Sequence, residues 1–301
     1  MRIAFFGTPD FAVPSLRALH AAGHEIALVV AQPDRPAGRG QQVQSPPVIR
    51  GARELGLPTT QPARIKTGDF PELLESLRLD LAVVVAYGRI LTTRLLAAPR
   101  GGCVNVHASI LPRWRGAAPI QWSILGGDAL AGVTTMQMAE GLDTGDTLLV
   151  AETPIGDEET AGELHDRLSL VGAELVVRTL ALAPAPVPQN HALATHAPML
   201  DREMGRIDWG MDAAAIHRKV RGLSPWPGAF TTFRGEVLKL LRVRRAEGQG
   251  LPGEILSRAR VASGGDAIEL LTVQLPGKKA MSGADFMNGS RPQPGERLGG
   301  P

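Results

Sequence analysis

Residues 103–146 read CVNVHASILPRWRGAAPIQWSILGGDALAGVTTMQMAEGLDTGD, and this stretch decides the predicted fold. It opens on a short apolar run, residues 103–107, that predicts a strand. Successive side chains of a strand alternate between its two faces, so Asn105 and His107, two residues apart, face the same side. The sequence therefore directs two polar side chains the same way near the end of a largely apolar strand.

A loop is expected directly after this strand. Pro112 and Pro119 lack the backbone N–H that a sheet ladder needs, and Gly116 between them favours a turn. In parallel α/β sheets, ligands bind beyond the carboxyl ends of the strands, where such loops lie. Asp143, within GLDTGD at residues 141–146, is the acidic residue expected to accompany the polar pair.

The composition fits a soluble globular protein. The chain has 301 residues, 44% of them apolar, which allows one large domain and a smaller one. Its single cysteine, Cys103, excludes an internal disulfide framework and a cysteine-based zinc site, and it suits a reducing compartment. Residues 1–6 meet a Gly-Thr-Pro-Asp turn too early for a signal peptide, and no apolar stretch reaches the length of a membrane span. We therefore expect a cytoplasmic protein.

The net charge of +2 conceals an asymmetry along the chain. Lys and Arg minus Asp and Glu gives −3 over residues 1–206 and +5 over residues 207–301. A basic C-terminal third points weakly to a polyanionic partner, and ordinary solvated surface charge is the equally weighted alternative.

The N-terminal residues predict a strand, a helix and a second strand. Residues 2–6 have a buried-strand pattern, residues 11–22 have apolar helical spacing, and residues 25–31 form the next strand. Gly7 is not followed by the glycine series that brings a backbone against a pyrophosphate, which disfavours dinucleotide binding. The pattern indicates a Rossmann-like α/β scaffold without the nucleotide fingerprint.

Residues 32–47, QPDRPAGRGQQVQSPP, predict a long loop. They contain four prolines, two glycines and the cations Arg35 and Arg39, with Asp34 as the only acid. A loop of this length without its own periodicity is usually functional or disordered. The residues alone leave open whether this is a functional loop or a mobile surface loop.

Helices and strands alternate through the rest of the first two thirds. We expect helices at residues 48–55, 70–78, 92–97 and 160–180, and strands at residues 81–86, 131–138 and 147–153. This order implies a mostly parallel sheet with crossover helices. Residues 183–188 contain three prolines and begin a polar run typical of a linker, so a domain boundary is expected near residues 190–206.

The C-terminal part predicts a small β-barrel. After a helix at residues 213–220 and a Pro-Trp-Pro corner, strand candidates lie at residues 229–233, 236–243, 253–256 and 267–273. Gly and Pro turns separate these short runs, which indicates a small OB-like barrel. Residues 242–245, together with Lys278 and Lys279, place cations on it, and the tail after Gly289 is expected to fray.

The central residues limit the chemistry. Asn105 is a neutral donor, the imidazole of His107 can accept and return a proton, and Asp143 can orient or charge the histidine. Cys103 has no cationic neighbour in sequence to lower its pKa, which disfavours a nucleophilic cysteine. Ser109 lacks the Gly-x-Ser-x-Gly elbow of a serine hydrolase. We expect no metal, because asparagine is a poor zinc ligand and no second histidine stands at ligand spacing.

The chemistry that remains after these exclusions is the transfer of an acyl-type group to an incoming nucleophile. In that chemistry Asn105 and His107 stabilise an oxyanion, while Asp143 acts on His107 and on proton movement. The alternative is an Asn-His pair that merely satisfies a turn, and the three residues alone leave it open.

The flanking sequence resembles the methionyl-tRNA formyltransferase family over nearly the whole chain. The resemblance lies in FGTPDFA (6–12), QPDRPAGRG (32–40), VVAYG (84–88), NVH (105–107), LPRWRGAAPIQ (111–121), MQM (136–138), GLDTGD (141–146), RIDW (206–209), PWP (225–227) and GKKAM (277–281). Asn105, His107 and Asp143 alone mark the wider formyltetrahydrofolate-dependent transferases. The loop at residues 35–40 and the C-terminal domain distinguish the tRNA enzymes from relatives that formylate glycinamide ribonucleotide or sugar nucleotides.

The resemblance implies an activity and a set of site residues. Members of the family transfer the formyl group of 10-formyltetrahydrofolate to the α-amino group of methionine on initiator tRNA, for translation initiation. The resemblance assigns catalysis to Asn105, His107 and Asp143. It implies folate contacts by Tyr87, Gly88, Ser109, Ile110, Leu111 and Pro112, and tRNA contacts by Arg35, Arg39, Lys278 and Lys279.

The chain departs from the family pattern at four positions: Ala108, Trp122, Met199 and Arg202. Met199 and Arg202 stand where linker lysines are expected, which bears on RNA contacts and leaves the chemistry intact.

The resulting hypothesis is a monomer with a catalytic domain at residues 1–189, a linker at residues 190–206 and a tRNA-binding β-barrel at residues 207–301. Within catalysis, its competitors are a formyltetrahydrofolate hydrolase and a transferase to a small amine. From another class, the competitor is a tRNA-binding protein without activity.

Overall fold

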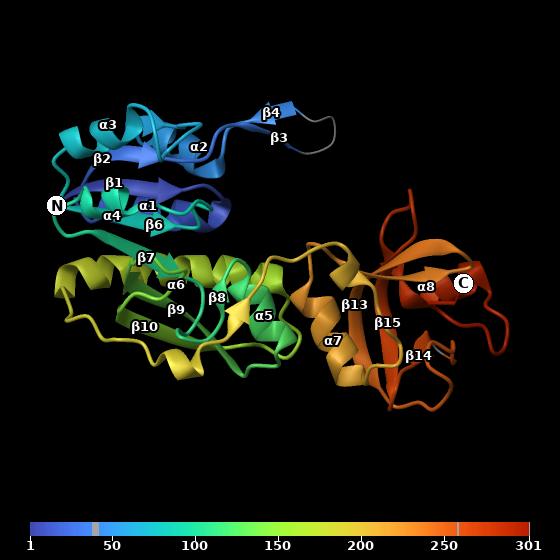
Figure 1. The fold of residues 1–301 in the computed structure, drawn as a ribbon. Coiled ribbons are helices and arrows are strands. Elements are labelled where there is room, and N and C mark those ends of the chain that lie inside the picture. Colours follow the sequence, from blue (N-terminus) through green and yellow to red (C-terminus); the bar gives the residue numbers. More distant parts are fainter. Residues whose placement is uncertain (38–41, 258, 301) are drawn as a thin grey trace. The chain divides into compact units, whose positions relative to one another are not determined.

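The computed structural model describes residues 1–37, 42–257 and 259–300. The chain forms two compact units, and Figure 1 labels most of their elements. Unit 1 comprises Met1–Pro119, Leu130–Pro154 and His165–Ala197, and unit 2 comprises Ile120–Ala129, Ile155–Leu164 and Pro198–Pro301. The catalytic, linker and tRNA-binding limits expected from the sequence remain a proposal.

Unit 1 is built on a seven-stranded sheet with the strand order β10-β9-β7-β6-β1-β2-β5. Its strands are β1 (Arg2–Gly7), β2 (Glu25–Val30), β5 (Thr59–Thr60), β6 (Leu81–Val85), β7 (Cys103–His107), β9 (Leu130–Gln137) and β10 (Thr147–Pro154). The four pairings from β7 to β5 are parallel, whereas β9 pairs antiparallel with both β7 and β10. The expected mostly parallel sheet is confirmed.

Apolar sequence explains the centre of this sheet. All five residues of β6 and the last five of β1 are buried, as near-continuous apolar strands are when helices cover a parallel sheet. The helices are α1 (Val13–Ala21), α2 (Pro47–Glu54), α3 (Phe70–Ser76), α4 (Thr93–Ala97) and α6 (Ala161–Leu182). Each lies within two residues of its expected position, except that a 3-10 turn, Asp10–Ala12, precedes α1.

The carboxyl ends of the parallel strands lie at one edge of the sheet. Thr8 follows β1, Gln32 follows β2 by two residues, and Tyr87 follows β6 by two residues. The carbonyl oxygen of Tyr87 accepts hydrogen bonds from Thr8 Oγ1 (3.1 Å) and Gln32 Nε2 (2.8 Å). These bonds fasten three strand ends together beside the end of β7.

Two of the described α-helices are absent from the sequence expectations, α5 (Pro119–Leu125) and, in unit 2, α8 (Gly283–Ser290). The sequence predicts a loop at Pro119 because proline cannot join a sheet ladder. Proline is also favoured at the first position of a helix, where its missing N–H has no partner to lose and its φ is already set. The same residue that ends the loop therefore begins α5.

The expectation of a loop without regular structure across residues 32–47 is wrong in part. A two-stranded antiparallel sheet forms from β3 (Arg35–Ala37) and β4 (Gln42–Gln44), with Pro36 opposite Val43. Proline is tolerated because both strands of a two-stranded sheet are edges. Arg39 lies outside the described residues.

Unit 2 contains a five-stranded antiparallel sheet with the path β12-β13-β15-β14, and β16 also pairs with β15. The strands are β12 (Ala229–Phe233), β13 (Glu236–Ala246), β14 (Arg260–Ala262), β15 (Ala267–Gln274) and β16 (Met281–Ser282), accompanied by α7 (Ala213–Gly222) and α8 (Gly283–Ser290). The small β-domain expected for the C-terminal part is confirmed.

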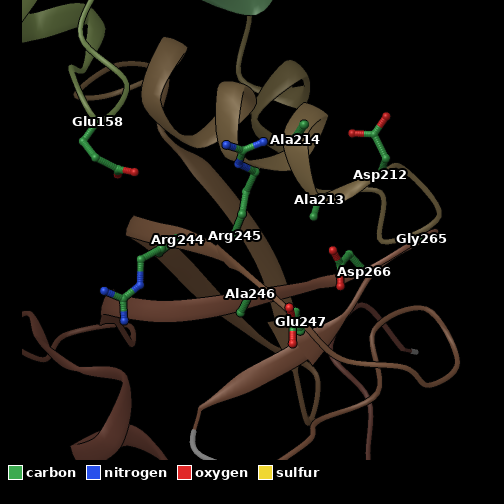
Figure 2. A pocket seen from close by; sticks show the side chains of 10 residues that line it. All are labelled: Glu158, Asp212, Ala213, Ala214, Arg244, Arg245, Ala246, Glu247, Gly265 and Asp266. Atoms are coloured by element: carbon green, nitrogen blue, oxygen red, sulfur yellow. The ribbon is translucent and has the colours of Figure 1, made fainter.

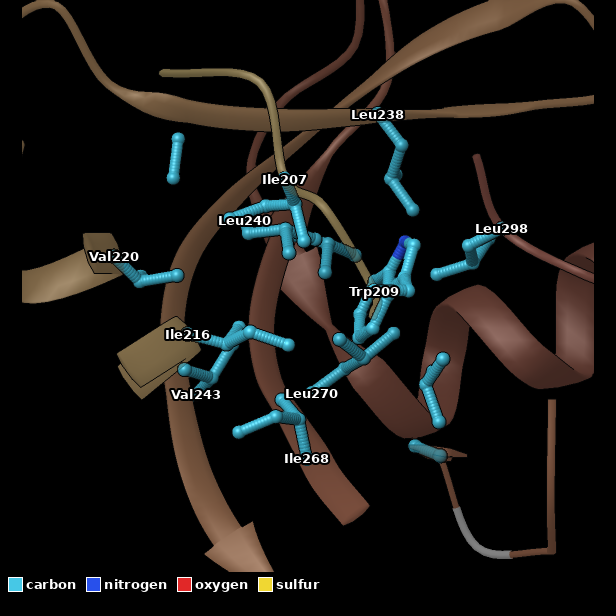
Figure 3. Close-up of a cluster of buried hydrophobic side chains, with 14 of the residues drawn as sticks. Ile207, Trp209, Ile216, Val220, Leu238, Leu240, Val243, Ile268, Leu270 and Leu298 are labelled. Atoms are coloured by element: carbon cyan, nitrogen blue, oxygen red, sulfur yellow. The ribbon is translucent and has the colours of Figure 1, made fainter. Parts of the chain in front are cut away.

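Two expectations for this unit are wrong. Residues 253–256 form no strand and make only isolated bridges, Glu254 with Arg297 and Ile255 with Val261. The tail does not fray near its end, because the N–H of Leu298 donates to Gly253 O at 2.8 Å and the Leu298 side chain is buried. Figure 3 shows Leu298 and Trp209 in one apolar cluster, so burial of Leu298 holds the tail.

Within the described residues, every helix is too short or too polar to cross a membrane.

Candidate active site

His107, the last residue of β7, is 6% exposed, and its two ring nitrogens face different partners. Its Nε2 lies 3.0 Å from the carbonyl oxygen of Trp114. Because a carbonyl oxygen can only accept, Nε2 is the nitrogen that carries hydrogen here. Nδ1 consequently faces Asp143, whose Oδ1 is 3.7 Å away. The expected His107 and Asp143 pair is therefore brought together in space, slightly beyond hydrogen-bond distance.

Asp143 stands in a turn with the left-handed φ of 52° and is 9% exposed. Its Oδ2 accepts a hydrogen bond from the backbone N–H of Gly116 at 2.8 Å, which leaves Oδ1 toward His107. Two residues on, Gly145 has no room for a Cβ, which would overlap the carbonyl oxygen of Gln137. The turn at residues 141–146 thus requires glycine to bring the carboxylate against the end of β7.

A buried polar chain that the sequence did not reveal supports this turn. Gln189 donates its Nε2 to the carbonyl oxygens of Asp143 (2.9 Å) and Gly145 (2.6 Å). Its Oε1 accepts from Nε (3.2 Å) and Nη2 (2.6 Å) of Arg115, which is 5% exposed. Gln189 directly follows the proline-rich residues 183–188 that predict a linker, so no local pattern identifies it.

Asn105 lies two residues before His107 on β7, between Val84 of β6 and Met136 of β9. Its side chain is half-buried, and no hydrogen bond or ion pair engages its amide within the part of the chain that the structure describes. An amide held on a rigid strand with its donor unused is suited to bind a ligand oxygen.

The segment that follows β7 is fixed against β9. The hydroxyl of Ser109 donates to Arg113 O at 2.6 Å, and Thr134 Oγ1 donates to Ser109 O at 2.7 Å while accepting from the N–H of Leu111 at 3.1 Å. Ser109 and Leu111 are buried, whereas Ile110 and Pro112 are half-buried. A ligand at this loop would therefore meet its backbone and the partly exposed pair.

Tyr87 and Gly88 follow β6 beside this loop. The Tyr87 ring is buried edge-on against Phe6, with centroids 5.3 Å apart, and burial raises the pKa of its phenol. Gly88 has a φ of +77°, and a Cβ there would meet the Gln32 side chain. Tyr87 and Gly88 therefore present backbone groups at this strand end.

Cys103 does not compete as a nucleophile. Burial raises the pKa of its thiol to about 12, and Sγ donates to the carbonyl oxygens of Leu95 (3.9 Å) and Leu96 (3.8 Å). A thiol in that state presents almost no thiolate at neutral pH. Within the ranges that the structure describes, no cluster of three or more His, Cys, Asp or Glu side chains could hold a metal ion.

The residues expected to contact tRNA lie in both units. Arg35, on β3 of unit 1, donates from Nη2 to Gln32 Oε1 at 2.7 Å, which ties it to the strand-end surface. Lys278 and Lys279 are exposed in the turn between β15 and β16 of unit 2, where Lys278 O accepts from Gln274 Nε2 at 2.9 Å. Arg39 falls in the undescribed segment.

Comparisons with known proteins agree with this arrangement. Residues 1–180 match the family described as formyl transferase, and residues 199–291 match the formyl transferase C-terminal domain. The fold and site thus define a formyl transferase.

The methionyl-tRNA formyltransferase of Ruegeria pomeroyi is 51% identical over 301 residues, covering 99% of this chain and 100% of the relative. That of Citrifermentans bemidjiense is 49% identical over 307 residues, covering 99% and 96%. HypX from Aquifex aeolicus in complex with tetrahydrofolic acid has the same fold, with a TM-score of 0.62 at 20% identity over 95% of this chain and 47% of that one. The chain belongs to the methionyl-tRNA formyltransferase family.

Proposed function

We propose that the chain transfers the formyl group of 10-formyltetrahydrofolate to the α-amino group of methionine on initiator tRNA. The observation that carries the proposal is the buried pair of His107 and Asp143 beside the unused amide of Asn105, at the carboxyl edge of the sheet. The full-length relatives named methionyl-tRNA formyltransferase support the same reaction.

In the proposed reaction, the amine nitrogen forms a bond to the formyl carbon while the bond from that carbon to the folate nitrogen breaks. A free α-amine has a pKa of about 7.7–8.0, so much of it is already neutral near pH 7.5 and no strong base is needed. The protein must then stabilise the charge that develops on the formyl oxygen. The Asn105 amide is the donor we assign to that oxygen, on a rigid strand where it needs no reorganisation.

We assign the transfer of the proton to His107 and Asp143. Trp114 O keeps hydrogen on Nε2, so Nδ1 is the ring atom that exchanges a proton with Asp143. The proton lost by the attacking amine must reach the departing folate nitrogen, and a histidine next to a carboxylate can hold it meanwhile. The Gly116 N–H holds the carboxylate during this exchange, and Gln189 holds the backbone carbonyl group of Asp143.

The remaining assignments belong to the same proposal. Folate is bound by Ser109 to Pro112 together with the backbone of Tyr87 and Gly88, and tRNA is bound by Arg35 and Arg39 with Lys278 and Lys279. The domain limits are residues 1–189 and 207–301 with the linker at 190–206. The protein acts in the cytoplasm as a monomer.

The decisive experiment supplies 10-formyltetrahydrofolate with methionyl initiator tRNA, methionyl elongator tRNA or no tRNA, and measures formylmethionyl-tRNA and formate. The proposal predicts formylation of the initiator and little product from the elongator. Formate released without tRNA would support a hydrolase instead. Binding of tRNA without formylation would support a binding protein.

A further inference from the structure

Unit 2 contains two hollows beside α7, and their charges differ. The larger, about 570 Å³, is shown in Figure 2 and is lined by the carboxylates of Glu158, Asp212, Glu247 and Asp266 with only Arg244 and Arg245. The smaller, about 330 Å³, is lined by Arg218, Arg221 and Arg245 with the carboxylates of Asp128 and Asp157. We call the smaller one the arginine pocket.

The arginines of this pocket have unused donors. Nε of Arg218 and Nε of Arg221 are both buried without a hydrogen-bond partner. Arg221 uses Nη1 on the carbonyl oxygens of Gly156 (2.9 Å) and Glu159 (2.8 Å). Within the part of the chain described by the structure, no ion pair joins Arg218 or Arg245 to a carboxylate. A buried guanidinium N–H without an acceptor is costly, and the other nitrogens of Arg218 and the exposed guanidinium of Arg245 are donors that a ligand in the pocket can engage.

The pocket is built rather than incidental. Gly127, with a φ of +75°, lies under the Arg218 stem, and a Cβ there would stand 3.3 Å from Arg218 Cδ and 3.4 Å from Nε. His217 closes one side, with its Nε2 on Glu158 Oε2 at 3.1 Å, and burial lowers its pKa. Ile124, Ala129 and Ile155 supply apolar walls. Its size falls in the lower range of small-molecule pockets.

We propose that the arginine pocket binds the phosphate group of a small phosphorylated molecule. Guanidinium groups bind phosphate through paired donors, and three of them line the pocket together with two carboxylates, while Glu158 and Glu159 also act on Arg221 from nearby. A concave site of this size, lined mostly by polar groups, suits a small anion better than an RNA backbone, which needs an open track of cations. The site is separate from the residues assigned to formyl transfer, so the proposal stands independently of that function.

The test is calorimetric titration of the full chain with inorganic phosphate and with pyrophosphate, at constant ionic strength. Arg218→Ala and Arg245→Ala should each weaken phosphate binding at least about 10-fold, as expected for a lost charge-assisted contact. Arg244→Ala is the matched control. It removes the same charge from the adjacent position, but Arg244 pairs with Glu269 at 2.7 Å and points in another direction in Figure 2.

Each outcome decides the proposal. Loss of phosphate binding in both pocket variants, with the Arg244→Ala control unchanged and all thermal unfolding transitions cooperative, supports it. Absence of phosphate and pyrophosphate binding to the wild type overturns it, as does equal binding by all variants. If the pocket variants lose affinity for tRNA but the wild type binds neither small anion, the arginines contact RNA and the small-molecule site is rejected.

Discussion

Gln189 donates one amide group to the carbonyl oxygen of Asp143 at 2.9 Å, although the two residues stand 46 positions apart in the chain. The same amide group reaches Gly145 O, and the amide oxygen accepts from the buried Arg115. The turn that carries Asp143 therefore depends on a side chain from a segment that has the composition of a linker. The position of the Asp143 carboxylate thus depends on buried hydrogen bonds to the turn as well as on the turn itself.

Replacing Gln189 tests this support. Gln189→Ala leaves two buried carbonyl groups and the Arg115 guanidinium short of partners, so the free energy of unfolding should fall by about 1–3 kcal/mol. We expect kcat to drop by about 10-fold with KM for folate little changed, because the displaced group acts on the proton. Urea unfolding and steady-state formylation measure both. Gln44→Ala, at an exposed glutamine, is the control, and equal behaviour of the two variants would reject the role of Gln189.

Cys103 gives a prediction about alkaline stability. Burial raises its pKa from 9.0 to about 12, so above pH 9 the unfolded chain releases a thiol proton that the folded chain retains. The stabilising contribution is complete below pH 9 and is lost as pH rises toward about 12. The unfolding free energy of the wild type should thus fall more steeply between about pH 9 and about pH 10.5 than that of Cys103→Ala. Tyr87 also titrates at alkaline pH, but its contribution to the dependence of unfolding free energy on pH is the same in both proteins and cancels. Parallel plots of unfolding free energy against pH would contradict the raised pKa of Cys103.

Lys278 and Lys279 give a prediction about salt. Each neutralised phosphate releases counterions, so removing either lysine should reduce the slope of log affinity for tRNA against log salt by about one unit. Lys66→Ala removes one exposed charge from unit 1 and should leave the slope alone. If the double variant keeps the wild-type slope, these two lysines are solvated surface charge.

The role of Arg39 in contacting tRNA is predicted from the sequence alone, because Arg39 lies outside the described residues. Arg39→Ala should lower kcat/KM for initiator methionyl-tRNA by about 10-fold or more, as for a lost charge-assisted contact, and Arg39→Lys less. The folate Kd should not change. The control is Arg178→Ala, at an exposed position of α6. Wild-type rates in both Arg39 variants would make the segment a surface loop without a reading role.

Much of unit 1 follows from local pattern. The apolar runs at β6 and β7 and the alternation of Asn105 with His107 are set by neighbours in sequence, so the strand and its polar face could be predicted. The sequence offers Asp143 only as the nearest expected acidic partner, because its proximity to His107 is created by the antiparallel pairing of β9 with β7.

The errors share a physical cause, which is tertiary contact overriding local composition. Leu298 follows a Pro- and Gly-rich run that predicts fraying, yet burial against Trp209 fixes it. Gln189 follows three prolines and looks like linker, yet Arg115 and the carbonyls of the Asp143 turn bind it. Pro36 argues against a strand, yet pairing with β4 accommodates it. The partners of Leu298 and Gln189 lie far away along the chain, whereas the pairing of Pro36 with Val43 is local and is obscured by the proline content.

The central claim is that Asn105, His107 and Asp143 perform formyl transfer. Its most direct measurement is the single-turnover rate of formylmethionyl-tRNA formation at saturating 10-formyltetrahydrofolate, for the wild type and for Asn105→Ala, His107→Ala and Asp143→Asn. We predict that each variant loses at least about 100-fold in this rate while its folate Kd stays within a few-fold of the wild type, as when a stabilising donor is removed from a transition state. Wild-type single-turnover rates at saturation, with the loss confined to folate or tRNA affinity, would show that the three residues only bind, and would contradict the account.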